Sequence, residues 1–138
     1  MQQRDLQKNN MNVLAIDYGT TNIGLAWMQV GVAVALPFGV IKTKDRNEQK
    51  NKLITLLKEE RIDVLVVGLP MSAEGIEESK NEIRVKKFID GLLKEYTIEV
   101  VYIDERFTSQ QADNTPGNVS RDEQAAIIIL EQYMYSKR

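Results

Sequence analysis

Short apolar runs alternate with longer amphipathic stretches along this chain. Three strand-like segments come first, at Val13–Asp17, Ile23–Gln29 and Gly31–Ile41, with only a few residues between them. Connections as short as these favour an antiparallel meander. Pro37, in the third segment, has no backbone N–H to donate, which predicts that this strand lies at a sheet edge or contains a bulge.

After the meander, helical and strand patterns alternate. The spacing predicts three helices, from about Arg46 to Glu60, from Ser79 to about Tyr96 and from Ser120 to near Tyr135, with strands between them at Val64–Gly68 and Glu99–Ile103. The continuous apolar run at Val64–Gly68 is typical of a parallel strand buried on both faces. Each helix opens on a capping residue followed three positions later by glutamate, which is the spacing of a capping box. The pairs are Asp45 and Glu48, Ser79 and Glu82, and Ser120 and Glu123.

One face of each predicted helix is apolar at helical spacing. The inward positions are Leu53, Leu56 and Leu57, then Val85, Phe88, Ile89, Leu92, Leu93 and Tyr96, and finally Ala125, Ala126, Ile129, Leu130 and Tyr133. The order βββαβαβα predicts an α/β fold with a mixed five-stranded sheet, strand order 3-2-1-4-5 and helices on both faces. We expect one domain over residues 11–138, preceded by a flexible polar tail at residues 1–10.

Composition narrows the chemistry. The 138 residues, 43% hydrophobic and 28% charged, have the profile of one ordinary globular domain. No run is apolar enough to cross a membrane and no secretion signal opens the chain, so we expect a cytoplasmic protein without a membrane partner. The sequence holds no histidine and no cysteine, which excludes a Ser-His-Asp triad, a histidine general base and the usual zinc sites. A metal bound by oxygen ligands would be Mg²⁺ or Mn²⁺.

Acidic residues gather at one predicted rim of the sheet. Asp17 ends the first strand, Asp104 and Glu105 follow the fifth, and Asp122 lies on the inward face of the last helix, in its first turn. Side chains alternate along a strand, so only one of Asp104 and Glu105 is expected to face Asp17. Converging carboxylates repel one another unless a cation is present, and one or two divalent ions there would suit phosphodiester cleavage.

Simpler interpretations compete with this site. Asp122 alone could stabilise the helix dipole by about 0.3–1 kcal/mol, and Tyr18–Asn22 could be a polar turn between two core strands. Hydroxyl groups near the rim would support such a metal site by holding phosphate oxygens or orienting metal-bound water, and these belong to Thr20, Thr21, Thr108 and Ser109. We interpret two basic sets as exposed polar faces rather than as a nucleic-acid groove. They are Lys42, Lys44, Arg46, Lys50 and Lys52, and then Lys80, Arg84, Lys86 and Lys87.

In four blocks the chain resembles the YqgF/RuvX family of RNase H-like proteins, which are linked to Holliday-junction resolution and to maturation of the 5′ end of pre-16S ribosomal RNA. The blocks, in family order, are IDYGTTNIGLA (Ile16–Ala26), VVGLPMSAEG (Val66–Gly75), IDERFTS (Ile103–Ser109) and DEQAAIIIL (Asp122–Leu130). The resemblance implies the RNase H-like fold and a metal-dependent endonuclease using Mg²⁺ or Mn²⁺. Its nucleic-acid partner would be pre-16S rRNA or branched DNA, and a homodimer is one option for its assembly.

The resemblance also assigns roles to individual residues. It makes Asp17, Glu105 and Asp122 the catalytic metal ligands, with Asp104 and Arg106 as supporting members of the same block. The candidate substrate-binding residues are Thr20, Thr21, Arg106, Thr108 and Ser109.

The chain departs from the family pattern at two places. Asn22 stands where the family usually has a basic residue, and residues 110–121 form a shorter and less basic segment than the family usually has. Both departures remove positive charge near the predicted site.

Two other functions stay open on the sequence alone. One is a non-catalytic adaptor in ribosome or DNA metabolism that keeps the fold and has lost activity. The other follows from Asp17–Asn22, which also looks like the first phosphate loop of actin/Hsp70-type ATPases. Those proteins need a second domain to close over the nucleotide, which 138 residues do not supply. Saturable ATP binding would be the observation that favours this alternative.

Overall fold

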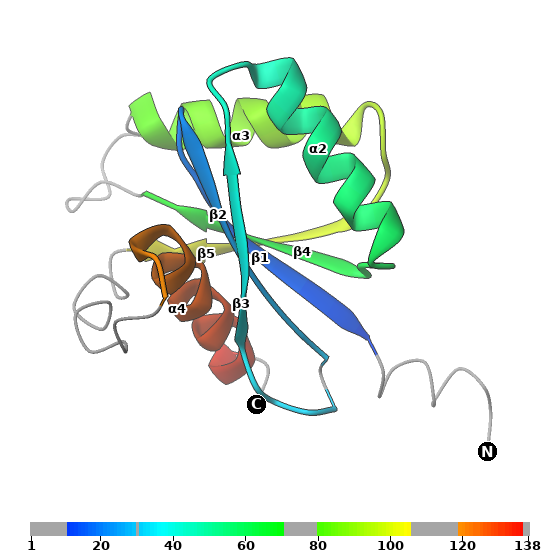
Figure 1. Ribbon diagram of the computed structural model, residues 1–138, viewed down its shortest axis with the longest axis vertical. Coiled ribbons are helices and arrows are strands. Elements are labelled where there is room, and N and C mark those ends of the chain that lie inside the picture. Colours follow the sequence, from blue (N-terminus) through cyan, green and yellow to red (C-terminus); the bar gives the residue numbers. More distant parts are fainter. Residues whose placement is uncertain (1–10, 30, 71–79, 106–118, 137–138) are drawn as a thin grey trace.

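A computed structural model describes residues 11–29, 31–70, 80–105 and 119–136 of the chain. Its centre is a five-stranded sheet with the order β3-β2-β1-β4-β5, as the sequence predicts (Figure 1). The strands are β1 (Asn12–Tyr18), β2 (Asn22–Gln29), β3 (Leu36–Lys42), β4 (Val64–Leu69) and β5 (Glu99–Asp104). Strands β1, β2 and β3 pair antiparallel, whereas β4 pairs parallel with both β1 and β5. The sheet is therefore mixed, with β1 joining its two parts.

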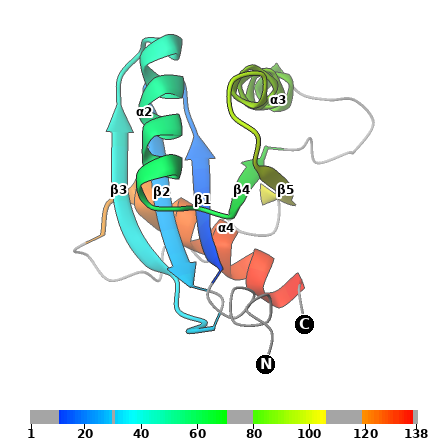
Figure 2. The same ribbon diagram turned by 90° about the vertical axis from the view of Figure 1, so that its right-hand side faces the viewer.

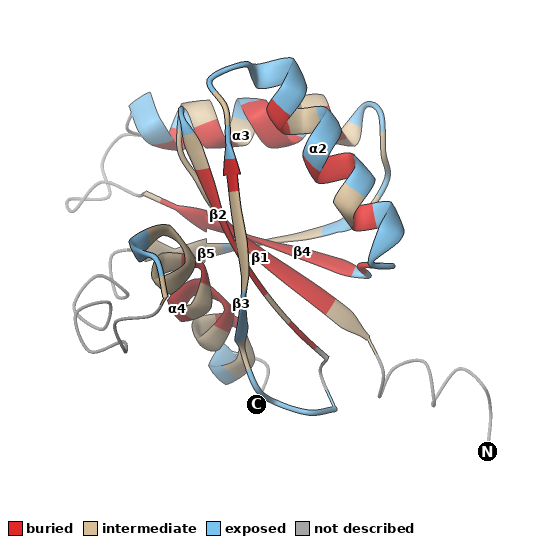
Figure 3. Ribbon diagram, viewed as in Figure 1, coloured by how far each residue is buried: buried red, intermediate tan, exposed pale blue. Residues whose placement is uncertain are grey.

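Helices cover both faces of the sheet (Figure 2). The helices are α2 (Arg46–Glu59), α3 (Lys80–Leu93) and α4 (Arg121–Ser136). Helices α2 and α3 lie on one face and α4 on the other, and alternate residues of β1 serve the two cores. Leu14 and Ile16 join the core under α2 and α3, while Val13 and Ala15 join the core under α4. Strand β4 is buried throughout, as its apolar run predicts (Figure 3).

The third strand is shorter than the sequence predicts. It begins at Leu36 rather than at Gly31. Ala33 in the preceding connection has a φ of 58°, which belongs to the left-handed region and not to a strand. The predicted effect of Pro37 is confirmed, because β3 is the edge strand and its pairing with β2 skips Phe38 at a bulge.

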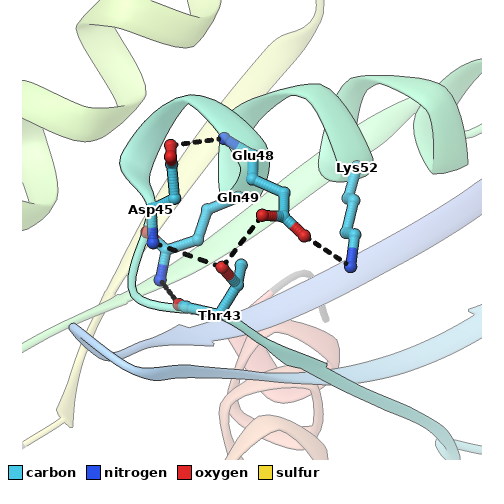
Figure 4. Close-up of polar contacts among 5 residues, drawn as sticks. All are labelled: Thr43, Asp45, Glu48, Gln49 and Lys52. Atoms are coloured by element: carbon cyan, nitrogen blue, oxygen red, sulfur yellow. Dashed lines mark hydrogen bonds and ion pairs between the residues drawn. The ribbon is translucent and has the colours of Figure 1, made fainter.

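Polar side chains at the start of α2 hold that helix to the end of β3. The Asp45 carboxylate accepts a hydrogen bond from the Glu48 backbone N–H at 3.0 Å, as predicted for a cap. The return half of the capping box runs through Thr43, whose hydroxyl accepts from the Asp45 N–H and donates to the Glu48 carboxylate, both at 3.2 Å (Figure 4). Glu48 also pairs with Lys52 at 3.1 Å. Thr43 therefore completes a box that two residues alone do not close.

Helix α4 begins with its predicted capping box. The Ser120 hydroxyl accepts from the Glu123 N–H at 3.2 Å, and the Ser120 N–H donates to the Glu123 carboxylate at 3.4 Å. The second oxygen of Glu123 accepts from the Gly39 N–H at 2.8 Å, so the cap also ties α4 to the bulged strand β3. The corresponding cap at Ser79 and the tail at residues 1–10 lie outside the described residues. No helix in the described ranges has the length and apolar character needed to span a bilayer.

Candidate functional site

The carboxyl groups of Asp17 and Glu105 meet at the rim where β1 and β5 end. Asp17 is the last but one residue of β1, and Glu105 directly follows β5. Strand β4 lies between them, and Gly68 of β4 leaves room for Glu105 to reach across, because a Cβ atom there would lie 2.6 Å from the Glu105 Oε1. The two acidic side chains share a hydrogen bond. The fold therefore brings together two acids that are far apart in the sequence.

Burial makes both acids harder to ionise. It raises the pKa of Asp17, a rise that the hydrogen bond from Glu105 opposes and the charge of Asp122 increases. The pKa of Glu105 is raised to about 8, first by burial and then by its hydrogen bond to Asp17 and by repulsion from Asp17 and Asp104. The rise favours the protonated form of Glu105 near neutral pH, in which its carboxyl donates a hydrogen bond to the Asp17 carboxylate.

Asp122 lies next to this pair, in the first turn of α4. Gly24 of β2 is the register partner of Asp17, and a Cβ atom on Gly24 would lie 2.0 Å from the backbone oxygen of Asp122. The absence of a side chain at Gly24 lets α4 rest directly on the sheet. The side-chain amide of Asn22 donates a hydrogen bond to the Asp122 carboxylate at 3.3 Å. Asn22 therefore orients the carboxylate of Asp122.

The three acids do not form a single tight cluster. Within the described part of the chain, no three acidic side chains converge closely enough to hold a metal ion between them. Asp17 and Glu105 are in contact, whereas Asp122 acts on Asp17 through its charge and is bonded to Asn22. The metal site with three acidic ligands therefore stays a prediction. The structure brings two of the three acids, Asp17 and Glu105, into contact.

Other predicted site residues are placed unequally. Of Asp104, the last residue of β5, and Glu105, which follows it, Glu105 is the one that shares a hydrogen bond with Asp17. Thr20 and Thr21 are exposed in the turn between β1 and β2. The remaining three candidates, Arg106, Thr108 and Ser109, lie outside the described residues.

An open pocket of about 260 Å³ lies beside Glu105. Its lining residues come from the end of β1 and the turn after it, from the residues that follow β4 and β5, and from the start of α3. They are Tyr18, Gly19, Thr20, Pro70, Asn81, Arg84, Val85 and Glu105. The Arg84 guanidinium donates a hydrogen bond to the Asn81 side chain at 3.0 Å. A carboxyl group, a hydroxyl group and a guanidinium group therefore line one pocket, which is the mixture that a phosphate group and a cation would need.

Gln49 is a site-supporting residue that the sequence analysis missed. It is fully buried, and its amide nitrogen donates to the carbonyl oxygens of Gly19 (3.3 Å), Thr20 (3.2 Å) and Thr43 (2.8 Å). Its carbonyl oxygen accepts from the Tyr18 hydroxyl at 3.3 Å. One side chain therefore fixes the turn that follows Asp17. The available signal was a polar residue four positions before an inward leucine of α2.

The mixed 3-2-1-4-5 sheet, with helices on both faces and acids at the rim, defines an RNase H-like protein. The RuvX family model, described as Holliday junction resolvase, matches residues 11–136. The chain therefore belongs to the RuvX family, also called YqgF, whose members carry nuclease names.

Individual relatives and solved structures agree with this assignment. A "Putative pre-16S rRNA nuclease" of Dictyoglomus turgidum is 32% identical, covering 91% of this chain and 95% of its own. The protein of the same name from Photobacterium profundum is 34% identical over 91% and 94% of the two chains. The structure of T. thermophilus RuvC in complex with Holliday junction substrate has a TM-score of 0.68 and 16% identity, covering 92% of this chain and 95% of that one. The last similarity shows the fold.

Proposed function

We propose that this protein is a Mg²⁺- or Mn²⁺-dependent endonuclease that hydrolyses phosphodiester bonds in structured nucleic acid. The single observation that carries the proposal is the contact between Asp17 and Glu105 at the carboxyl ends of the strands. The chain belongs to a family whose members are named as nucleases, which supports a catalytic role for this pair of acids. Asp122, held beside Asp17 by the close approach at Gly24, is the third catalytic ligand that we propose.

The donor groups at the rim suit a hard divalent cation. Carboxylate oxygens are the ligands that Mg²⁺ and Mn²⁺ prefer, and the chain has no histidine or cysteine that would favour a softer metal. Two half-buried acids in contact have raised pKa values, and a bound cation would favour their ionised forms. A divalent ion bound there would neutralise phosphate charge and activate water for hydrolysis.

The protein's own groups would position the substrate. Thr20 and Arg84 line the same pocket as Glu105, so a hydroxyl and a guanidinium group are available for the non-bridging oxygens of the phosphate. Gln49 fixes the backbone of the turn that carries Thr20. Asn22 orients the carboxylate of Asp122 through its amide.

Precursor 16S rRNA is the substrate that we propose first. Relatives at 32% and 34% identity carry that substrate in their names and match this chain over nearly all of their length. Branched DNA is the second candidate, because the matching family model is described as a Holliday junction resolvase. The two candidates share the same bond to be cleaved and the same three acids.

The test compares cleavage of both substrates by the wild-type protein and by Asp17→Asn, in Mg²⁺, in Mn²⁺ and in EDTA. We expect the wild type to cleave precursor rRNA with either ion and EDTA to abolish the reaction. Loss of a metal ligand should lower kcat/KM by more than about a hundredfold. Asp90→Asn, an exposed position on α3, is the matched control and should retain activity.

Two results would contradict the proposal. Equal cleavage by the wild type and Asp17→Asn would show that another nuclease in the preparation is responsible. Binding of either nucleic acid without cleavage by the wild type would instead identify a non-catalytic adaptor. Cleavage of the junction but not of the rRNA would support the nuclease activity and identify branched DNA as its substrate.

A further inference from the structure

Members of the two basic sets, which we interpret from the sequence as exposed polar faces, line one hollow in the structure. Arg46 and Lys50 lie on α2, and Arg84 and Lys87 lie on α3. Both helices lie on the same face of the sheet (Figure 2). Tyr18 is among the residues that line a hollow between them. The question is therefore what a cleft with two basic walls would bind.

The α2–α3 cleft is a hollow of about 140 Å³ between the two helices. It is lined by Tyr18, Arg46, Asn47, Lys50, Arg84, Lys87, Phe88 and Gly91. Its floor is aromatic, because the rings of Tyr18 and Phe88 pack with their centroids 4.4 Å apart. Four of the lining residues are positively charged and none is acidic.

The nearby acidic side chains neutralise only part of this charge. Lys50 forms an ion pair with Glu95. Arg84 donates to the neutral side chain of Asn81 at 3.0 Å. For Arg46 and Lys87, no ion pair with another described residue is present, and both side chains are exposed. Most of the cleft's positive charge therefore remains available to an anion.

The cleft adjoins the pocket beside Glu105. Tyr18 and Arg84 line both hollows, so they form the boundary between them. A strand whose phosphate lies in the pocket beside Glu105 would pass Arg84 and enter the α2–α3 cleft. A row of cations leading away from a cleavage site suits a polyanion better than a single small ion, because a backbone presents a phosphate at every nucleotide.

We propose that the α2–α3 cleft binds the phosphate backbone of the substrate strand on one side of the cleaved bond. Arg46 and Lys87 contact the backbone and position it, while the aromatic floor and Arg84 set the path from the cleavage site. The contacts are made to phosphates and carry no base specificity. The inference rests on the proposed function for the identity of the strand, and its test measures binding in the absence of cleavage.

The experiment measures RNA affinity against salt concentration in a protein that cannot cleave. Asp17→Asn protein in EDTA is titrated with a labelled RNA oligonucleotide that spans the 5′ boundary of 16S rRNA. On this background, Arg46→Gln and Lys87→Gln should each weaken binding to the same extent for unrelated RNA sequences. Each should also reduce the slope of log K against log salt by about 0.7 for a single strand, or about 0.9 for a duplex.

Lys52→Gln is the matched control. Lys52 lies on α2, the helix that carries Arg46, and it pairs with Glu48 away from the cleft. The substitution removes one positive charge, as each of the other two does. The RNA affinity and salt slope of Lys52→Gln should equal those of the Asp17→Asn protein that lacks this second substitution. Unchanged thermal unfolding for all three variants would show that the comparison reports binding alone. Salt slopes for Arg46→Gln and Lys87→Gln that match Lys52→Gln would overturn the proposal, as would competition by inorganic phosphate at the same phosphate concentration as the RNA.

Substrate truncation tests the direction of the strand. In otherwise wild-type protein, the loss of kcat/KM caused by Lys87→Gln should disappear when nucleotides are removed on one side of the cleaved bond. It should persist when they are removed on the other side, because only one flank reaches the cleft. Persistence after either truncation would contradict the proposed path. If the wild type binds RNA but does not cleave it, the proposed function fails while the salt-slope test of the cleft stands.

Discussion

Two glycines decide how closely the acidic residues approach one another. The missing side chain at Gly68 leaves room for Glu105 to cross β4, and the missing side chain at Gly24 lets α4 pack directly on β2. At both positions the space that a side chain would occupy is filled by another element. The residues that build the site therefore include two that contribute no functional group.

Gly24→Ala should destabilise the protein and displace Asp122. The added Cβ would meet backbone atoms, which cannot rotate away, so we expect a loss of unfolding free energy of about 3 kcal/mol, at the upper end of overpacking effects. Urea denaturation measures the loss. Gly91→Ala on α3 is the control, because among the described residues no atom outside its own stretch of helix lies within 4 Å of its Cβ position. In a helix it should stabilise by about 0.5–1 kcal/mol; equal effects at the two sites would contradict the assigned role of Gly24.

At the scale of residues, sequence patterns locate the acids but do not choose among them. Asp17, Glu105 and Asp122 are found because each ends a strand or begins a helix. Strand alternation alone leaves Asp104 and Glu105 as equal candidates. The family resemblance selects Glu105, and the structure adds the physical reason, because Gly68 of β4 leaves room for Glu105 to reach Asp17.

At the scale of elements, α2 is the support on which the β1–β2 turn rests. Its cap joins it to Thr43 at the end of β3 (Figure 4). Gln49, one turn further along the helix, binds the carbonyl oxygens of Gly19 and Thr20. The helix therefore fixes the end of β3 and the loop after Asp17 at the same time. A helix that contributes no acid to the site still determines where the first acid points.

Gln49→Leu should lower the unfolding free energy by about 2–4 kcal/mol, because three backbone carbonyl groups and a phenol lose their partner. Asn51→Leu, at an exposed position two residues along the same helix, should change it by less than about 0.5 kcal/mol. Denaturant titration of both variants checks the difference. If Gln49→Leu lowers activity by more than it lowers the folded fraction, the additional loss reports displacement of the β1–β2 turn. Similar stability for the two variants would mean that the amide network contributes little.

Periodicity predicts elements well here and their polar connections poorly. The apolar stripes and capping pairs give the order and the approximate bounds of the strands and helices. The third strand is overextended because apolar residues from Val32 to Leu36 look like a strand, although Ala33 turns the chain. Gln49 interrupts an apolar stripe, and its three acceptors come from segments whose proximity no local pattern reveals.

For the molecule as a whole, the paired acids link stability to pH and to metal. The folded protein binds the Glu105 proton more tightly than the unfolded chain, so stability without metal should fall as pH rises from about 4.5 to about 8 and then level off. The raised pKa of Asp17 acts in the same direction. Thermal unfolding in EDTA across this range measures the slope, and Glu105→Gln should flatten it. An equal slope in the variant would contradict the assignment.

Mn²⁺ should reverse this dependence, because cation binding requires the deprotonated acids. The increase in melting temperature caused by Mn²⁺ should therefore grow between pH 6 and pH 8. At a concentration a hundredfold above Kd the ion would stabilise the fold by about 2.7 kcal/mol. Asp17→Asn should lose most of that increase.

Helix α4 follows all five strands, yet it delivers the acid that lies next to the first of them, and the bond from Asn22 to Asp122 spans 100 positions of sequence. Contacts of such separation form late, because much of the chain must be ordered first. During translation, a nascent chain that has already made its whole sheet still lacks Asp122. Under the proposed function, the ribosome that synthesises this enzyme therefore carries an inactive nuclease until the last helix emerges and docks.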